Sequence, residues 1–407
     1  MNQQPKVTWQ LPDEEVEWSE LEAQWDNQEE DNSFMAQVKR GMTGMNAGFD
    51  NGLKVINNHI HGTHRGRYYL IGADSGVGKT TIADFMYLYS LWRSAKKKGI
   101  KLYIKYFSFE LSAAEKKAKW VCQWIKTIYD IDLSTDYIMG RIPGLLLKSE
   151  DLKMVMRAYG VVEEMMQDMV LIDHMLHPTG MLNKLVEDHY EKIGDVLRDV
   201  PKEGKKKGMI RGFRAKDPSA LTIVIVDHLA LINVEGGAIT TKQIMDRWSM
   251  YSVQLRNIFN TTLIQIQQFS TSMMSAYREQ KKSEAAIAPQ RLDFGDSSYT
   301  YRDADAVFGM IKPIQYNLKT FNGYNLEDIG QYFIALFLMK NRYGPADRWM
   351  PLFMNPLSGM FYDIPASSTY LLDANGVSKP AIEFFITEAK RIENICQQFS
   401  SPQGKPQ

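Results

Sequence analysis

The sequence predicts an α/β protein with a largely parallel central β-sheet and helices on both faces of that sheet. Apolar residues make up 44% of the 407-residue chain, which is enough for one large core. Strand-like and helical patterns alternate from Tyr68 to about residue 365, and parallel strands need such crossovers between them. The expected strands are residues 68–73, 101–109, 169–173, 221–228, 261–268, 305–311 and 331–340.

The first expected strand leads into the glycine-rich segment "ADSGVGKTT" and then into a helical pattern. This spacing is that of a P-loop, with Ala73 where the first glycine usually stands. In such a loop, backbone N–H groups turn onto phosphate oxygens, the lysine neutralises the β- and γ-phosphates, and the next hydroxyl binds Mg²⁺. We therefore expect ATP and Mg²⁺ as cofactors, bound by Ala73, Asp74, Ser75, Gly76, Val77, Gly78, Lys79, Thr80 and Thr81.

Two acidic residues stand at the ends of later strands. Glu110 follows the strand that ends in "FSF", and Asp227 ends the apolar strand "LTIVIVD". Ligands of α/β sheets gather at these carboxyl ends. Glu110 could polarise an attacking water, or it could cap the next helix. After a P-loop, Asp227 is expected to hold the Mg²⁺ directly or through water.

Charge is distributed unevenly along the chain. Residues 1–38 hold one basic and ten acidic residues, which leaves 47 basic against 38 acidic residues in 39–407, a formal net charge of +9. A basic body permits polyanion binding without proving it. We expect an acidic mobile arm or docking segment over 1–33, a connector over 34–67, the main α/β domain over 68–365, and a C-terminal helix near 380–398 with a polar tail within 366–407.

The composition also indicates a compartment. Cys122 and Cys396 are too few for a disulfide framework, which favours a reducing environment. No apolar run reaches membrane-spanning length, and the start "MNQQPKVTWQ" lacks the features of a signal peptide. We expect a cytoplasmic protein with no membrane partner.

Six segments occur in the order seen in DnaB-type replicative helicases: "ADSGVGKTT", "FSFELS", "VIVDHLALI", "LIQIQQFS", "SSYTYRDADAVF" and "MKNRYGP". Over about residues 40–365 the chain resembles the RecA-like motor domain of that family, of a kind common in bacteriophages. The last segment is the most discriminating, because a Lys-x-Arg-x-Gly after a late strand is not general among RecA-fold ATPases. The resemblance implies a RecA-like P-loop NTPase fold for residues 68–365.

The resemblance also implies roles for individual residues. Lys79 and Thr80 would bind nucleotide and metal, Glu110 would activate water, and Asp227 would support the metal. Gln268 would sense the γ-phosphate and relay its state towards DNA. Lys340 and Arg342 would reach into the neighbouring subunit's site. Lys119 stands where the family usually has an arginine near the nucleotide.

Two basic segments are candidates for contact with nucleic acid. The long polar loop after Gln268 would face a central channel, where Arg278, Lys281, Lys282 and Arg291 would contact DNA; the alternative is a surface loop. An insertion over 201–220 follows a helix expected to end near Val200. It is expected to be a solvated hairpin rather than a DNA contact, and its basic residues are Lys205, Lys206, Lys207, Arg211 and Arg214.

The histidines of the chain are expected to be structural. His59, His61 and His64 are spaced as a metal site would need, but no cysteine or carboxylate lies close to them in sequence, and a glycine turn explains the segment. His228 follows Asp227 where bacterial relatives usually have tyrosine, and we expect it to be a satisfied structural histidine.

Together these features predict an ATP-dependent replicative DNA helicase. It would assemble as a ring, expected to be a hexamer, and translocate on single-stranded DNA to unwind duplex at a fork. The alternatives are a RecA-type recombinase that forms filaments, and a nucleotide-binding regulatory scaffold with little turnover. About forty residues precede the motor in this sequence, so we expect the family's N-terminal helical domain to be missing. The acidic arm is the candidate substitute for engaging a primase or loader protein.

Overall fold

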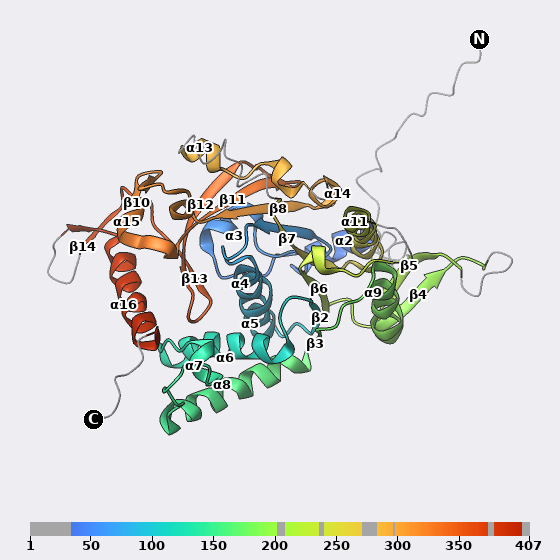
Figure 1. The fold of residues 1–407 in the computed structure, drawn as a ribbon. Helices are drawn as coiled ribbons and strands as arrows, with labels where there is room; N and C mark the ends of the chain where they lie inside the picture. Colours follow the sequence, from blue (N-terminus) through green and yellow to red (C-terminus); the bar gives the residue numbers. More distant parts are fainter. Residues whose placement is uncertain are drawn as a thin grey trace, which may run out of the picture.

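The structure is a computed structural model that describes residues 34–201, 208–235, 240–270, 283–295, 298–372 and 378–400. Its centre is a nine-stranded sheet (Figure 1). The strands from β8 to β3 pair in parallel, while β11, β12 and β13 add antiparallel pairs at one side. In spatial order they are β13 (Met360–Asp363), β12 (Arg348–Asn355), β11 (Phe333–Asn341), β8 (Ala306–Ile311), β1 (Tyr68–Ala73), β7 (Thr262–Gln268), β6 (Leu221–Asp227), β2 (Leu102–Ser108) and β3 (Met169–Ile172). The expected α/β fold with a largely parallel sheet is confirmed.

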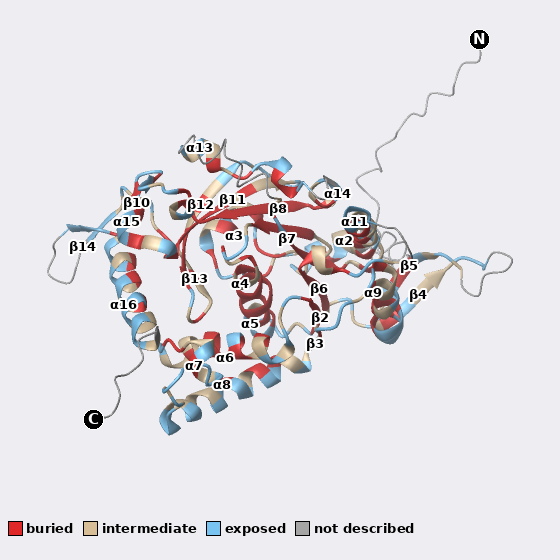
Figure 2. Ribbon diagram, in the orientation of Figure 1, coloured by how far each residue is buried: buried red, intermediate tan, exposed pale blue. Residues whose placement is uncertain are grey.

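Two apolar clusters cover the two faces of the sheet, and β1 shows how they divide. Tyr69 and Ile71 belong to one cluster and Tyr68 and Leu70 to the other, because successive side chains of a strand point to opposite faces. The sheet is buried over most of its length (Figure 2). Both faces must therefore be apolar, which explains why the inner strands read as continuous apolar runs.

Helices complete the two clusters. The first face is covered by α3 (Lys54–Ile60), α4 (Lys79–Ala83), the π-helical η1 (Asp84–Ser90), α5 (Leu91–Lys97), α6 (Ala113–Tyr129), α7 (Thr135–Ile138) and α8 (Ser149–Gln167). The second is covered by α9 (Pro178–Leu185), η2 (Val186–Tyr190), α11 (Thr241–Phe259), α13 (Glu284–Ile287), α15 (Leu326–Ile329) and α16 (Glu383–Ser400). Among the described residues, no helix combines the length and the apolar character needed to cross a membrane.

Shorter elements lie between these. They are α2 (Phe34–Met42), α10 (Glu191–Ile193), η3 (Leu229–Leu231), η5 (Arg291–Phe294), α14 (Ser298–Asp303), η6 (Pro313–Tyr316) and η7 (Gly330–Tyr332). Three two-stranded ribbons complete the fold: β4 (Gly194–Arg198) with β5 (Ile210–Ala215), β9 (Thr320–Phe321) with β10 (Tyr324–Asn325), and β14 (Tyr370–Leu372) with β15 (Ser378–Pro380).

The basic insertion contributes β5, which pairs antiparallel with β4 from the segment before the insertion, as expected of a hairpin. The helix expected to continue to about Val200 is wrong, because α10 ends at Ile193 and β4 begins at Gly194. Gly194 is fully extended, with φ of −174°, and glycine is a poor helix former. Lys205, Lys206 and Lys207 lie outside the described residues.

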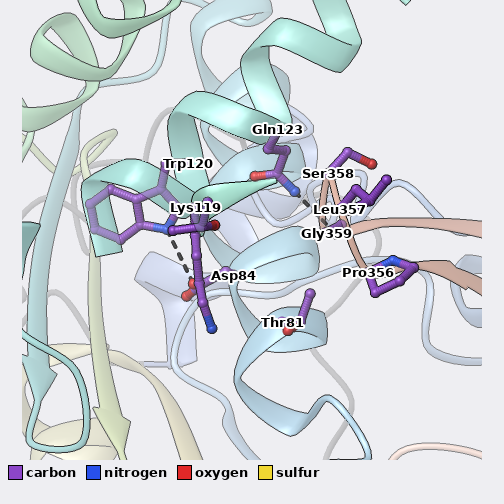
Figure 3. A pocket seen from close by; sticks show the side chains of 10 residues that line it. Thr81, Asp84, Lys119, Trp120, Gln123, Pro356, Leu357, Ser358 and Gly359 are labelled. Carbon is purple, nitrogen blue, oxygen red and sulfur yellow. Dashed lines mark hydrogen bonds between the residues drawn. The ribbon is translucent and has the colours of Figure 1, made fainter. Parts of the chain in front are cut away.

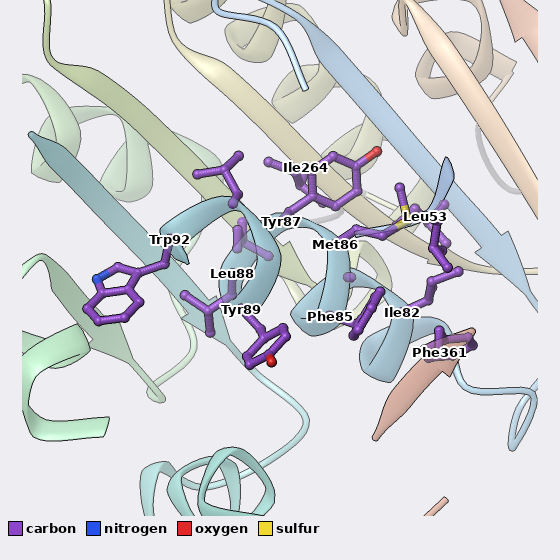
Figure 4. Close-up of a cluster of buried hydrophobic side chains, with 14 of the residues drawn as sticks. Leu53, Ile82, Phe85, Met86, Tyr87, Leu88, Tyr89, Trp92, Ile264 and Phe361 are labelled. Atoms are coloured by element: carbon purple, nitrogen blue, oxygen red, sulfur yellow. The ribbon is translucent and has the colours of Figure 1, made fainter. Parts of the chain in front are cut away.

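Part of the segment expected to be a connector packs into the body of the protein. Phe49 pairs with Thr63 through two backbone hydrogen bonds of 2.8 Å, and Leu53 is fully buried beside Phe85 and Met86 (Figure 4). Gly52 has φ of 86°, and a Cβ there would lie 2.3 Å from Ser90 Oγ. This close approach allows the segment to lie directly on the helix that follows the P-loop.

Replacing Leu53 with alanine should reduce the free energy of unfolding by about 2–5 kcal/mol, since it empties a buried leucine site. Leu146, which is 84% exposed, is the matched control, and Leu146→Ala should change stability by less than about 0.5 kcal/mol. Urea titration of the two variants measures both values. Equal, small effects would mean that residues 49–60 do not contribute to the core.

Candidate active site

The carboxyl ends of four neighbouring parallel strands bring the expected phosphate-site residues together. Ala73 at the end of β1 lies opposite Gln268 at the end of β7, and Ser108 at the end of β2 lies opposite Asp227 at the end of β6. Glu110 follows two residues after Ser108. The P-loop, Gln268, Asp227 and Glu110 therefore share one edge of the sheet.

The P-loop has the backbone shape that a phosphate cradle needs. Gly76 and Gly78 have φ of 74° and 109°, values that side chains rarely permit, and α4 begins directly afterwards. Lys79 is 6% exposed, and its Nζ donates to the Asp74 carbonyl at 3.4 Å. Tyr316 fixes the loop from the other side by donating to the Asp74 carboxylate at 2.9 Å. A helix N-terminus behind such a loop favours anions.

Two oxygen groups lie where Mg²⁺ is expected. The Thr80 hydroxyl donates to Asp227 Oδ1 at 2.9 Å, and Asp227 is fully buried. Hydroxyl and carboxylate oxygens suit Mg²⁺, which normally keeps several waters and substrate phosphates as its other ligands. The described residues hold no cluster of three or more metal-binding side chains. This sparse oxygen pair fits a metal that arrives with a nucleotide.

A buried lysine, Lys116 on α6, joins this site although sequence reasoning missed it. Its Nζ donates to Asp227 Oδ2 at 3.0 Å and to Asp84 at 3.3 and 3.4 Å, and it contacts the Tyr106 hydroxyl. Burial by itself would lower the pKa of Lys116, but the carboxylates of Asp84 and Asp227 outweigh it and raise that pKa. Lys116 therefore stays charged.

The sequence did carry a signal for Lys116. It sits in the basic run "EKKAK", which reads as a solvated surface, yet it lies one helical turn before the buried Trp120. Residues four apart share one face of a helix. A charged residue in register with an apolar stripe indicates a buried ion pair.

Lys119 lines a cleft beside the phosphate site (Figure 3). The cleft lies between α6, the helix that follows the P-loop, and the turn between β12 and β13. Thr81, Trp120 and Gly359 also line it, and a Cβ on Gly359 would approach Thr81 Cγ2 to 3.2 Å. The side chain of Lys119 extends from α6 towards the helix that carries Thr81.

Glu110 is exposed at the edge of the sheet and does not cap the next helix. The N-cap of α6 is Ser112, whose hydroxyl accepts from the Glu115 N–H, so the capping alternative for Glu110 is wrong. Burial, aided by Lys79, lowers the pKa of the neighbouring His228, while Glu110 and Asp227 act in the opposite direction. His228 is therefore neutral near pH 7.

His228 differs from the satisfied histidine that we expected. Within the described part of the chain, its buried Nδ1 has no hydrogen-bond partner. The ring nitrogens of His64, in contrast, lie 2.9 Å from the Ile60 carbonyl and 3.3 Å from the Asn46 carbonyl, and the neutral ring donates to one of them. Its pKa is lowered, chiefly by burial.

Lys340 and Arg342 lie at the opposite edge of the sheet. Strand β11 runs antiparallel to β8, so its final residue, Asn341, lies opposite Ala306 at the start of β8. Lys340 Nζ donates to the Tyr301 carbonyl at 3.1 Å. The Arg342 guanidinium is 3.2 Å from the Asp305 carboxylate, and its side chain is 41% exposed.

Asp305 anchors this edge and was not singled out from the sequence. Its carboxylate accepts from the Tyr68 backbone N–H and from Arg256, each at 2.9 Å. Asp305 lies within the segment "SSYTYRDADAVF", directly before an apolar strand. This position in the sequence was the available signal that the aspartate is buried. Asp305 holds Arg342 at the amino ends of β1 and β8.

Of the expected DNA-contacting residues, Arg291 is described and is exposed in η5. The η5 turn lies close in space to the end of β7, because the Ser270 N–H donates to the Asp293 carbonyl at 2.7 Å. Arg278, Lys281 and Lys282 lie outside the described residues.

The fold and its loop define a RecA-like P-loop domain. A solved structure described as an ATPase domain matches it with a TM-score of 0.59 and 14% identity, covering 83% of this chain and 100% of that one. A DnaB-like replicative helicase, described together with its interactions with primase, matches with a TM-score of 0.57 and 16% identity, covering 82% and 67%.

The family model of the DnaB-like helicase C-terminal domain matches residues 48–359, and the chain belongs to that family. The resemblance seen in the sequence is thereby confirmed. No curated protein matches the chain by sequence.

Lys79→Ala should weaken binding of a fluorescent ATP analogue by about 10- to 100-fold, since a hydrogen bond to a charged group contributes about 1.5–3 kcal/mol. The melting temperature should stay close to that of the wild type, because the bond from Lys79 is a long one to a carbonyl of its own loop. Lys117→Ala on α6 is the matched control and should bind normally. Normal binding by a folded Lys79→Ala protein would contradict the phosphate-site assignment.

Proposed function

We propose that this chain is an ATP-driven DNA helicase whose nucleotide sites form between subunits of a ring. The observation that carries the proposal is the separation of Lys79 and Arg342 on opposite edges of the sheet. Membership of the helicase family supports the reaction class, and the strand directions support the shared site.

The geometry makes a site within one chain unsuitable for Arg342. Strand β1 has six residues and separates the two edges by about 20 Å, at about 3.3 Å per residue. An arginine side chain is much shorter than this. Two copies arranged head to tail would instead bring Arg342 of one against the P-loop of the next, and such heterologous contacts form a ring when the rotation between subunits closes. A hexamer is the assembly expected from the family.

Each residue at the carboxyl edge has a task in ATP hydrolysis. Lys79 would hold the β- and γ-phosphates, and Thr80 with Asp227 would hold Mg²⁺, which when bound would supply positive charge against the phosphates. Glu110 orients the attacking water and accepts its proton. Arg342 from the neighbour stabilises the charge that develops on the γ-phosphoryl group, and Lys340 adds a second cation nearby.

Gln268 couples this chemistry to DNA. It is exposed beside Ala73 at the start of the P-loop, and the polar loop that follows it leads to Arg291. A change in γ-phosphate occupancy at Gln268 would move this loop. Phosphate contacts by Arg278, Lys281, Lys282 and Arg291 would grip single-stranded DNA without regard to sequence.

The cleft beside Thr81 would place Lys119 near the bound nucleotide. It opens next to the P-loop helix, and Lys119 lines it. Residues 1–33 would serve as a docking segment for a primase or a loader. The acidic composition of this segment suits a basic partner surface.

Arg342→Ala should bind nucleotide and assemble normally yet lose hydrolysis by about 10³- to 10⁵-fold, as expected for an arginine supplied in trans. Mixing it with Lys79→Ala protein should restore part of the activity, because an intact P-loop then meets an intact arginine. Steady-state phosphate release measures both. Arg214→Ala, on the β4–β5 ribbon, is the arginine control and should hydrolyse ATP normally.

Two outcomes would contradict the shared site. One is hydrolysis at the wild-type rate by Arg342→Ala, and the other is an inactive mixture despite demonstrated subunit exchange.

A strand-displacement assay on forked DNA beside a strand-exchange assay separates a helicase from a recombinase. Little turnover, with or without single-stranded DNA, would favour a scaffold.

A further inference from the structure

A buried charge cluster formed by Asp84, Lys116 and Asp227 lies behind the phosphate site, and Asp84 and Lys116 have no task assigned so far. Lys116 is fully buried, and its ammonium lies between the two carboxylates at 3.3 Å and 3.0 Å. Asp84 is further fixed by Tyr106, which donates at 2.7 Å, and by Trp120, which donates at 3.1 Å. The cluster is therefore tied to β2, α6 and the helix after the P-loop.

Each oxygen of the Asp227 carboxylate has a different partner. Oδ1 accepts from the Thr80 hydroxyl at 2.9 Å, and Oδ2 accepts from Lys116 at 3.0 Å. The terminal torsion of an aspartate is otherwise broad, so a carboxylate without the second bond could rotate. Lys116 removes that freedom and leaves Oδ1 on the Thr80 side.

We propose that Lys116 is a positioning residue that orients Asp227, so that one defined carboxylate oxygen faces the Mg²⁺ carried by the nucleotide. This inference rests on the proposed ATP site. Asp84 has the complementary role, because it balances the charge of Lys116. With two carboxylates and one ammonium, the cluster carries a net charge of −1, which still attracts a dication.

The geometry distinguishes this role from simple core stability. Asp84, which is fixed by Tyr106 and Trp120, holds Lys116 independently of the bond from Lys116 to Asp227. The bond from Lys116 to Asp227 points towards the phosphate site. Loss of Lys116 should therefore affect both the stability of the fold and the response to Mg²⁺, and the two effects can be separated by treating Asp84 independently.

The test compares Lys116→Met, Asp84→Asn and the double variant with the wild type. Two quantities are measured for each protein: the melting temperature, and the Mg²⁺ concentration that gives half-maximal binding of a fluorescent ATP analogue. Lys116→Met should lower the melting temperature, because two buried carboxylates lose their counter-charge. It should raise the Mg²⁺ requirement by about tenfold or more, the size typical of partners that orient metal ligands.

The double variant provides the decisive comparison. In Asp84→Asn the amide oxygen can accept from Trp120, and the amide NH2 can donate to the Tyr106 hydroxyl oxygen, so the double variant should recover most of the melting temperature while keeping the raised Mg²⁺ requirement. Asp84→Asn alone should keep a Mg²⁺ requirement close to that of the wild type, since its Lys116 still holds Asp227.

Three results would overturn the inference. One is an unchanged Mg²⁺ requirement in Lys116→Met. Another is recovery of the melting temperature and of the Mg²⁺ requirement together in the double variant, which would show a purely structural role. The last is a Mg²⁺ requirement raised by Asp84→Asn alone as much as by Lys116→Met. A wild-type protein that binds the analogue without any Mg²⁺ dependence would instead overturn the proposed function.

Discussion

The direction of the strands decides where this chain can do chemistry. Because β1, β7, β6 and β2 run parallel, their carboxyl ends place the P-loop, Gln268, Asp227 and Glu110 on one edge. Because β11 turns back against β8, the cations that follow it lie at the other edge. The backbone hydrogen bonds of the sheet fix both strand directions. No side-chain rearrangement within one chain could therefore bring the cations that follow β11 to the P-loop. The proposed sharing of each nucleotide site between two subunits follows from this constraint.

The carboxyl edge is built on buried charge, which is costly. Removing one partner of a buried ion pair typically destabilises a protein by about 3–5 kcal/mol. In the intact cluster the cost of burying charge is limited because Lys116 pairs with both Asp84 and Asp227. Tyr106 and Trp120 also hydrogen-bond to Asp84. The bond from Lys116 to Asp227 Oδ2 orients Oδ1 towards Thr80 before any ligand binds. Such preorganisation is what electrostatic catalysis requires.

Much of the sheet could be predicted, because buried parallel strands are continuous apolar runs. The strand containing Tyr68 was placed at its observed bounds. The strands β12 and β13 were not expected. Strand β13 is short and lies at the edge of the sheet, where patterns are weaker, whereas β12 has eight residues and pairs on both sides. At the site, glycines and strand-ending carboxylates are visible in sequence. Asp84, Lys116 and Asp305 were missed because their roles depend on contacts between residues far apart in the chain. One example is the contact of Lys116 with Asp227.

We propose above all that a second subunit completes each nucleotide-binding site. Electron microscopy of the protein with a non-hydrolysable ATP analogue, Mg²⁺ and forked DNA tests this most directly. The account predicts a closed ring with one DNA strand through it, in which Arg342 of each subunit lies within about 3 Å of a γ-phosphate held by Lys79 of its neighbour. A nucleotide contacted by one chain only, with Arg342 still on Asp305 of its own subunit, would contradict it.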